Sequence, residues 1–154
     1  MVEYFYLITV LPLVGFLING LFGTKIKNEK VSGIIGSLMV LGSFIITVLA
    51  YLHITSLPQE SRSITIPLFN WISSGSLNIS AAYLVDPLSV TMCLIITGVG
   101  FLIHVYAIGY MHGDRGFARF FAFLNLFIFA MLNLVLGDNM LLMFLGWEGV
   151  GLCS

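Results

Sequence analysis

The chain has 154 residues, of which 59% are hydrophobic and only 8% are charged. Soluble domains carry roughly 25% charged residues, so a soluble fold of this size would lack solubilising surface. The formal net charge of -1 provides neither a basic patch for nucleic acid nor an acidic face for a basic partner. Composition therefore indicates a polytopic protein of the lipid bilayer, with no nucleic-acid partner.

The two cysteines, Cys93 and Cys153, lie far apart in apolar runs, and neither belongs to a C-x-x-C arrangement. A typical iron–sulfur cluster requires about four cysteine ligands. We therefore expect no disulfide framework, no metal site and no cofactor on this chain. Any redox cofactor would have to be bound by another chain.

Two uncharged apolar runs, Tyr4 to Phe22 and Val31 to Leu52, are found near the N-terminus. Each is close to the roughly 20 residues that cross a bilayer core. The first run follows Glu3 rather than Lys or Arg, and no A-x-A cleavage site comes after it, so it is predicted to be a membrane span rather than a signal peptide. In the second run, Ser32 and Gly36 have the four-residue spacing that lets helices approach closely.

Three more apolar runs follow, from Pro87 to Tyr110, from Phe117 to Leu136, and from Asn139 to Ser154, where the run is still apolar. Pro87 suits a first helical turn because its missing N–H is not needed there. Asp86 and Asp138 precede helix starts, where carboxylates commonly serve as caps. Each of the three runs is predicted to be a membrane-spanning helix.

The segment between the second and third runs does not have a helical pattern. The β-formers of Ile64–Ile66 are followed by the turn-like Ser73–Ser76 and by alternating residues from Leu77 to Tyr83. We predict an extramembrane β-hairpin over residues 61–84. The expected fold class is all-α transmembrane, a single membrane domain over residues 1–154 with about five membrane-spanning helices and an outer β-hairpin between helices two and three.

Orientation follows from the basic residues, five of which fall in two loops. These are Lys25, Lys27 and Lys30 between the first two runs, and Arg115 and Arg119 between the third and fourth. The positive-inside rule places both loops in the cytoplasm or the matrix and the N-terminus outside.

Glu148 is a carboxylate inside the fifth run, about 15 Å from its outer end and near the middle of the hydrocarbon. An ionised carboxylate there costs several kcal/mol unless it is protonated, paired or hydrated. A neutral acid exchanges protons near neutral pH, and a paired one responds to its cation. We predict that Glu148 carries the chemistry of this protein; the alternative is a polar contact between helices. The nearby Gly146 and Gly149 suggest close backbone approach.

His104 lies near the inner end of the third run. The near-neutral pKa typical of histidine suits a proton relay. A hydrogen bond to a neighbouring helix is the alternative. The phenylalanines between Phe117 and Phe129 are more typical of a lipid-facing or packing surface than of a cofactor site.

Four segments carry a family resemblance: LLMFLGWEGVGLCS at 141–154, VDPLSVTM at 85–92, GVGFLIHVYAIGYM at 98–111 and RFFAFLNLFIFAMLNLVLGDN at 119–139. They resemble the antiporter-like L subunit of respiratory complex I, the proton-pumping NADH:quinone oxidoreductase. The large subunit of multi-subunit Na⁺/H⁺ antiporters shares the glutamate after Gly-Trp, but the residues after Glu148 look like the complex I form.

The resemblance implies that Glu148 couples to a lysine on a later helix and takes part in proton translocation driven by quinone reduction elsewhere in the complex. It implies other complex I membrane subunits as partners and the bacterial inner (plasma) membrane, or the mitochondrial inner membrane, as the location. Family members have well over a dozen helices, so the 154 residues look like the N-terminal portion of the subunit. Such a portion alone should not pump, and a scaffold fragment that only packs against neighbouring subunits is a further alternative.

Overall fold

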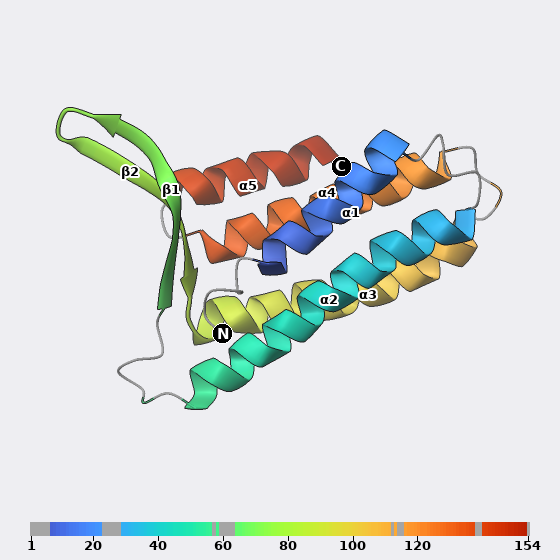
Figure 1. Ribbon diagram of the computed structural model, residues 1–154, viewed down its shortest axis with the longest axis horizontal. Coiled ribbons are helices and arrows are strands. Elements are labelled where there is room, and N and C mark those ends of the chain that lie inside the picture. The colour runs from blue at the N-terminus through green and yellow to red at the C-terminus, as the bar shows by residue number, and fades with distance from the viewer. Residues whose placement is uncertain are drawn as a thin grey trace.

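The computed structural model describes residues 7–22, 29–56, 58, 64–111, 113, 116–137 and 140–153. In these ranges the chain forms five helices and one two-stranded sheet (Figure 1). The elements are α1 (Leu7–Phe22), α2 (Glu29–Ser56), β1 (Ile64–Ser74), β2 (Leu77–Val85), α3 (Pro87–Tyr110), α4 (Phe117–Leu136) and α5 (Met140–Cys153).

Three of the described helices are long and apolar enough to cross a membrane. They cover Lys30–Ser56 of α2 and the whole of α3 and α4. The helices α1 and α5 are apolar but shorter, with 16 and 14 residues. The structure therefore has the helical, membrane-type architecture that the composition predicts.

The predicted helix bounds agree with the structure for α3 and α4, which begin and end at the expected residues. The predicted bounds of the second helix, Val31 to Leu52, were too short at both ends, because α2 begins at Glu29 and continues to Ser56. Its last turn tolerates polar residues because the Thr55 hydroxyl donates to the Leu52 carbonyl at 3.1 Å and the Ser56 hydroxyl to the His53 carbonyl at 2.7 Å. The predicted starts at Tyr4 and Asn139 lie outside the described residues.

Asp86 caps α3, as the sequence predicted. Its Oδ1 accepts a hydrogen bond from the Ser89 backbone N–H at 2.8 Å, and the Ser89 hydroxyl accepts one from the Asp86 N–H at 3.0 Å. These two reciprocal bonds form a capping box, with Pro87 in the first turn. The second predicted cap, Asp138, lies outside the described residues.

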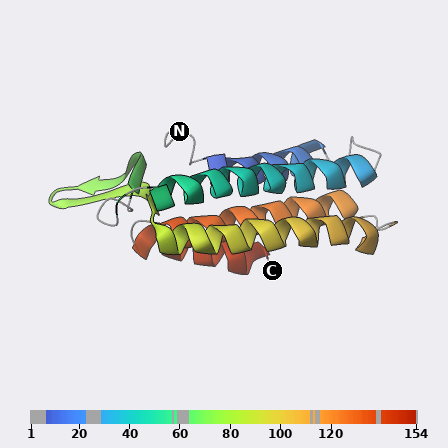
Figure 2. The same cartoon turned by 90° about the horizontal axis from the view of Figure 1, so that it is seen from below.

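The strands β1 and β2 pair antiparallel around a turn at Gly75, whose φ of 59° suits glycine. Irregularities in the pairing lie between Pro67 and Phe69 and between Asn70 and Ile72. The described hairpin overlaps the predicted one and continues to Val85; residues 61–63 lie outside the described part. Figure 2 shows the hairpin projecting from one end of a bundle of side-by-side helices.

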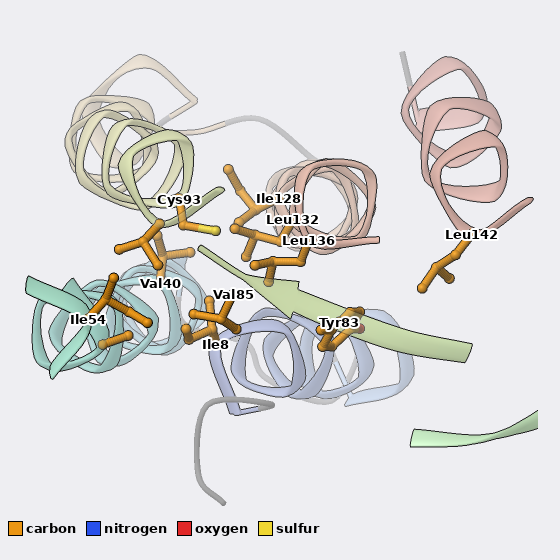
Figure 3. Packing of buried hydrophobic residues seen from close by; sticks show 12 residues of the cluster. Ile8, Val40, Ile54, Tyr83, Val85, Cys93, Ile128, Leu132, Leu136 and Leu142 are labelled. Carbon is orange, nitrogen blue, oxygen red and sulfur yellow. The ribbon is translucent and has the colours of Figure 1, made fainter. Parts of the chain in front are cut away.

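The core of the bundle centres on α4, which contacts each of the other four helices and β2. In Figure 3, the α4 side chains Ile128, Leu132 and Leu136 point toward the centre of the packing, where Cys93 and Val85 also lie. The buried cluster draws on every helix and on β2, and comprises Ile8, Val40, Ala50, Ile54, Tyr83, Val85, Val90, Cys93, Ile128, Leu132, Leu136 and Leu142.

Tyr83 joins the base of the hairpin to α4. Its hydroxyl donates to Oδ1 of Asn133 at 2.5 Å, and its backbone pairs with Gly137 beyond the end of α4. Burial raises the pKa of Tyr83 above its ordinary value. The phenol is therefore a neutral hydrogen-bond donor at physiological pH, and it holds the hairpin at one end of the bundle.

Candidate functional site

Glycines on α5 set its distance from α4. A Cβ built on Gly146 would lie 2.6 Å from the Leu134 amide nitrogen and 2.8 Å from the Ala130 carbonyl oxygen. One built on Gly149 would lie 3.0 Å from Cβ of Ala130. Since real Cβ atoms essentially never approach backbone atoms within 3 Å, only glycine allows this packing at position 146. The close backbone approach predicted around Glu148 is present.

Glu148 lies on the face of α5 turned away from α4. It follows Gly146 by two positions, which corresponds to a rotation of about 200° around the helix axis. It lies about 12 Å along that axis from Met140, the first residue of α5. Its side chain is exposed. Its neighbours on this open face are large and apolar, with Trp147 69% and Leu152 82% exposed. Among the described residues no ion pair holds the carboxylate, so the arrangement presents an acid on an apolar face.

His104 is buried, with 1% of its surface exposed, and each ring nitrogen has a partner. Nδ1 lies 2.7 Å from the Gly100 carbonyl oxygen, one turn back on α3. Because a carbonyl oxygen only accepts, Nδ1 carries a proton and donates it. Nε2 lies 2.6 Å from Oδ1 of Asn125 on α4. The hydrogen bond to a neighbouring helix that sequence analysis weighed against a relay is therefore present.

Asn125 is a residue of this site that the sequence analysis did not single out. It is fully buried on α4, and its amide occupies space that Gly15 of α1 leaves open, where a Cβ would collide with Nδ2. The feature of the sequence that could have identified Asn125 is its position in a strongly apolar helix, because uncharged polar side chains at such positions usually form hydrogen bonds across helices.

The two predicted site residues are not brought into one cluster by the described chain. Both ring nitrogens of His104 are taken by Gly100 and Asn125, and Glu148 faces away from α4. The helix α4 is their shared support, because His104 bonds to it and α5 packs on it. Across the described residues no group of three or more His, Cys, Asp or Glu side chains gathers as metal ligands would.

Some of the phenylalanines between Phe117 and Phe129 pack inside the bundle, and others are partly exposed. Phe117 and Phe121 are buried, with ring centroids 4.8 Å apart, whereas Phe123 is 39% exposed. A Cβ on Gly36 would lie 3.2 Å from the Phe121 ring, so α2 and α4 approach closely there, as the spacing of small residues predicted.

Comparison with known proteins relates the chain to one family. Residues 71–121 match the family described as NADH-ubiquinone oxidoreductase (complex I), chain 5 N-terminus. The resemblance to the N-terminal portion of the antiporter-like L subunit is confirmed. The chain is 46% identical over 145 residues to NADH-quinone oxidoreductase subunit L of Escherichia coli K12, a match covering 94% of this chain. It is 40% identical over 147 residues to NADH-ubiquinone oxidoreductase chain 5 of Hypocrea jecorina, covering 96% of this chain.

The L-subunit relatives are much longer than this chain. It spans 23% of the Escherichia coli protein and 21% of the Hypocrea jecorina protein. The matches come from both bacterial subunit L and fungal chain 5 sequences. They therefore relate this helix bundle to a part of the L subunit.

Proposed function

We propose that this chain is the N-terminal helix bundle of a proton-translocating membrane-arm subunit of NADH:quinone oxidoreductase. In this proposal it carries no redox site of its own, and quinone reduction on other chains drives proton movement through ionisable residues that lie within the membrane. The observation that carries the proposal is Glu148, an acid exposed on the open apolar face of α5 in a chain related to the L subunit.

Lipid is an unfavourable environment for an acidic side chain. An ionised carboxylate facing hydrocarbon costs several kcal/mol, so Glu148 must be protonated, paired or hydrated in the membrane. The described lysine, Lys30, lies in the first turn of α2, at the opposite end of the bundle from the start of α5. We propose that a lysine of a later helix approaches the open face of α5 and pairs with Glu148. Moving that lysine would change the proton affinity of the acid.

His104 is the second proposed proton group. Its Nδ1 proton is held by Gly100, so proton exchange takes place at Nε2, which faces Asn125. The charge on the ring then decides whether Nε2 donates to or accepts from the amide of Asn125.

The proposed membrane architecture has five spans in one domain, with the hairpin outside the membrane. The helices α1 and α5 rise about 24 Å and 21 Å at 1.5 Å per residue, against a core about 30 Å thick. Both pack along α4, whose 20 residues cover that thickness. Lys30 and Arg119 lie at the end of the bundle opposite the hairpin, which supports an inner basic end and an outer hairpin.

The proposed location is the bacterial inner (plasma) membrane, with the mitochondrial inner membrane as the alternative. The proposed partners are other complex I membrane subunits and lipid. The open face of α5 carries large exposed apolar side chains around Glu148. Because an acid in that setting requires a polar or charged partner, this face supports contact with another protein.

Replacing Glu148 with glutamine in the complete complex tests the proposal. We expect Glu148→Gln to lower NADH-driven proton pumping severalfold, because the amide keeps the shape of the side chain but cannot exchange a proton. The measurement is proton uptake into sealed vesicles, recorded together with quinone reduction.

Asp86→Asn is the matched control, since it also removes one carboxylate but keeps the cap on α3. It should pump like the unaltered complex. Normal pumping and normal quinone reduction in Glu148→Gln would leave only a scaffold role. Sodium transport that persists without NADH would instead indicate Na⁺/H⁺ exchange.

A further inference from the structure

Buried polar side chains meet where α1, α2, α3 and α4 come together. Asn19 of α1 and Asn125 of α4 are 1% and 0% exposed. Both amides border Gly36 of α2, where a Cβ would lie 3.3 Å from Nδ2 of Asn125 and 3.4 Å from Nδ2 of Asn19. The other end of Asn125 bonds to His104 of α3. Four helices thus enclose one polar junction.

Two atoms of this junction lack a hydrogen-bond partner among the described residues. They are Oδ1 of Asn19, an acceptor, and Nδ2 of Asn125, a donor. The other amide atom of Asn19 donates to the Ser32 carbonyl at 3.4 Å, which fixes the orientation of that side chain. Leaving buried polar atoms unpaired destabilises a fold, because each atom loses the hydrogen bond that water gave it in the unfolded chain. The junction therefore offers one acceptor and one donor to a small polar ligand.

The chemistry of His104 specifies this ligand further. When Nε2 carries a proton, it donates to Oδ1 of Asn125, and Nδ2 of the amide faces Gly36. When Nε2 is deprotonated it accepts, so the amide must turn to donate through Nδ2, and its oxygen then faces Gly36. A ligand that serves both states must both donate and accept. Water does so, and it can also donate to Oδ1 of Asn19.

An open cavity borders the junction at Asn19, on the proposed inner end of the bundle. It has a volume of about 750 Å³ and lies between the last turns of α1 and the first turns of α4. Asn19 lines it, as do Gly20, Arg119 and Ala122. Asn19 therefore belongs both to the lining of this cavity and to the junction at Gly36, while the exposed Arg119 marks the cavity as the basic, inner side of the bundle.

We propose that a water molecule binds between Asn19 and Asn125 and connects the inner cavity to His104 through hydrogen bonds. This inference rests on the proposed function, for which it supplies a route of proton uptake. A protonated water in the junction gives its proton to deprotonated Nε2 as the Asn125 amide turns aside. One O–H bond breaks and one N–H bond forms. The positive charge passes to the ring, and neutral water remains.

The direct test is a cryo-electron microscopy map of the complete complex at a resolution that shows ordered water. We expect density within hydrogen-bond distance, about 3 Å, of both Oδ1 of Asn19 and an Asn125 amide atom. A direct bond between the two amides would overturn the proposal. A lipid acyl chain filling the cavity would overturn it as well.

The functional test replaces Asn19 with leucine in the complete complex. Asn19→Leu keeps the approximate volume and removes the water's acceptor, so we expect loss of the bridging density and fewer protons moved per quinone reduced. Asn19→Ser keeps an oxygen and should restore part of the lost pumping. If Asn19→Leu does not assemble, the map of the unaltered complex and Asn19→Ser decide the question.

Thr97→Val is the matched control, because it removes a buried hydroxyl that donates only to its own helix, to the Cys93 carbonyl at 2.6 Å. It should leave both the water and the pumping unchanged. A complex in which Glu148→Gln abolishes pumping while Asn19→Leu changes neither pumping nor the water density would refute this route and keep the proposed function. Normal pumping in Glu148→Gln would refute the proposed function itself.

Discussion

At the scale of single residues, two side chains illustrate how polar groups are placed in an apolar helix. His104 bonds to Gly100 on its own helix and to Asn125 on the next, so its ring is held in one orientation. Asp86 works locally, because its carboxylate and Ser89 exchange hydrogen bonds within one turn. The first arrangement needs two helices to meet, whereas the second needs only neighbours in the sequence.

The cap on α3 leads to a prediction about local stability. Removing the carboxylate in Asp86→Ala should cost about 1 kcal/mol, because the Ser89 N–H loses its acceptor. Backbone amides in the first turn of α3 should then exchange hydrogen roughly fivefold faster. Mass-spectrometric hydrogen exchange on the purified complex measures this. Asp86→Asn retains the acceptor and should exchange like the unaltered protein; equal rates in the alanine variant would contradict the role of the cap.

At the scale of elements, α5 depends on α4 for its position. Leu142 and Gly146 are the buried residues of α5, and its open face carries Glu148. Because Gly146 nearly touches the Leu134 backbone, the angle at which the acid faces outward follows from this one close contact. Small residues of this kind let membrane helices approach without any hydrophobic driving force between them.

The contact at Gly146 leads to a prediction about assembly. Gly146→Ala should destabilise the packing of α5 by about 1–3 kcal/mol, because the added methyl group meets backbone atoms that cannot move aside without separating the helices. The measurement is the yield and the thermal midpoint of the purified complex. Gly151→Ala is the matched control on the same helix, since a Cβ there meets nothing within 4 Å in the described chain. Equal losses from both variants would argue against the contact.

At the scale of the whole molecule, the bundle has two chemically different ends. One end carries the hairpin, held to α4 by Tyr83 and Asn133. The other carries Lys30 and Arg119 and opens into the cavity beside Asn19. These two ends correspond to the proposed outer and inner sides of the membrane.

The orientation of the bundle leads to a topological prediction. A cysteine at the hairpin turn, Ser76→Cys, should react with a membrane-impermeant maleimide from the outer side of oriented vesicles. Lys30→Cys should react only after the vesicles are opened, since it lies at the basic end. Labelling above that of the unaltered protein is the measurement, because Cys93 and Cys153 are already present. The reverse pattern would invert the proposed topology.

Much of the helical framework was predictable from the sequence. The bounds of α3 and α4 follow from apolar runs between polar residues, and the cap at Asp86 follows from its position before Pro87. These features depend on residues close together in the chain, whose hydropathy and hydrogen bonding are local. The same is true of the turn at Gly75.

The candidate site was predictable only in part. By itself, the sequence determined that an acid, Glu148, and a histidine, His104, lie in apolar helices, where each polar side chain requires a partner or a change of protonation state. The tertiary structure alone decided that Asn125 binds His104, that Asn19 reaches the same junction, and that Gly146 turns Glu148 away from α4. The reason is physical: such contacts join helices distant in the chain, and they depend on packing distances that no local pattern of residues contains.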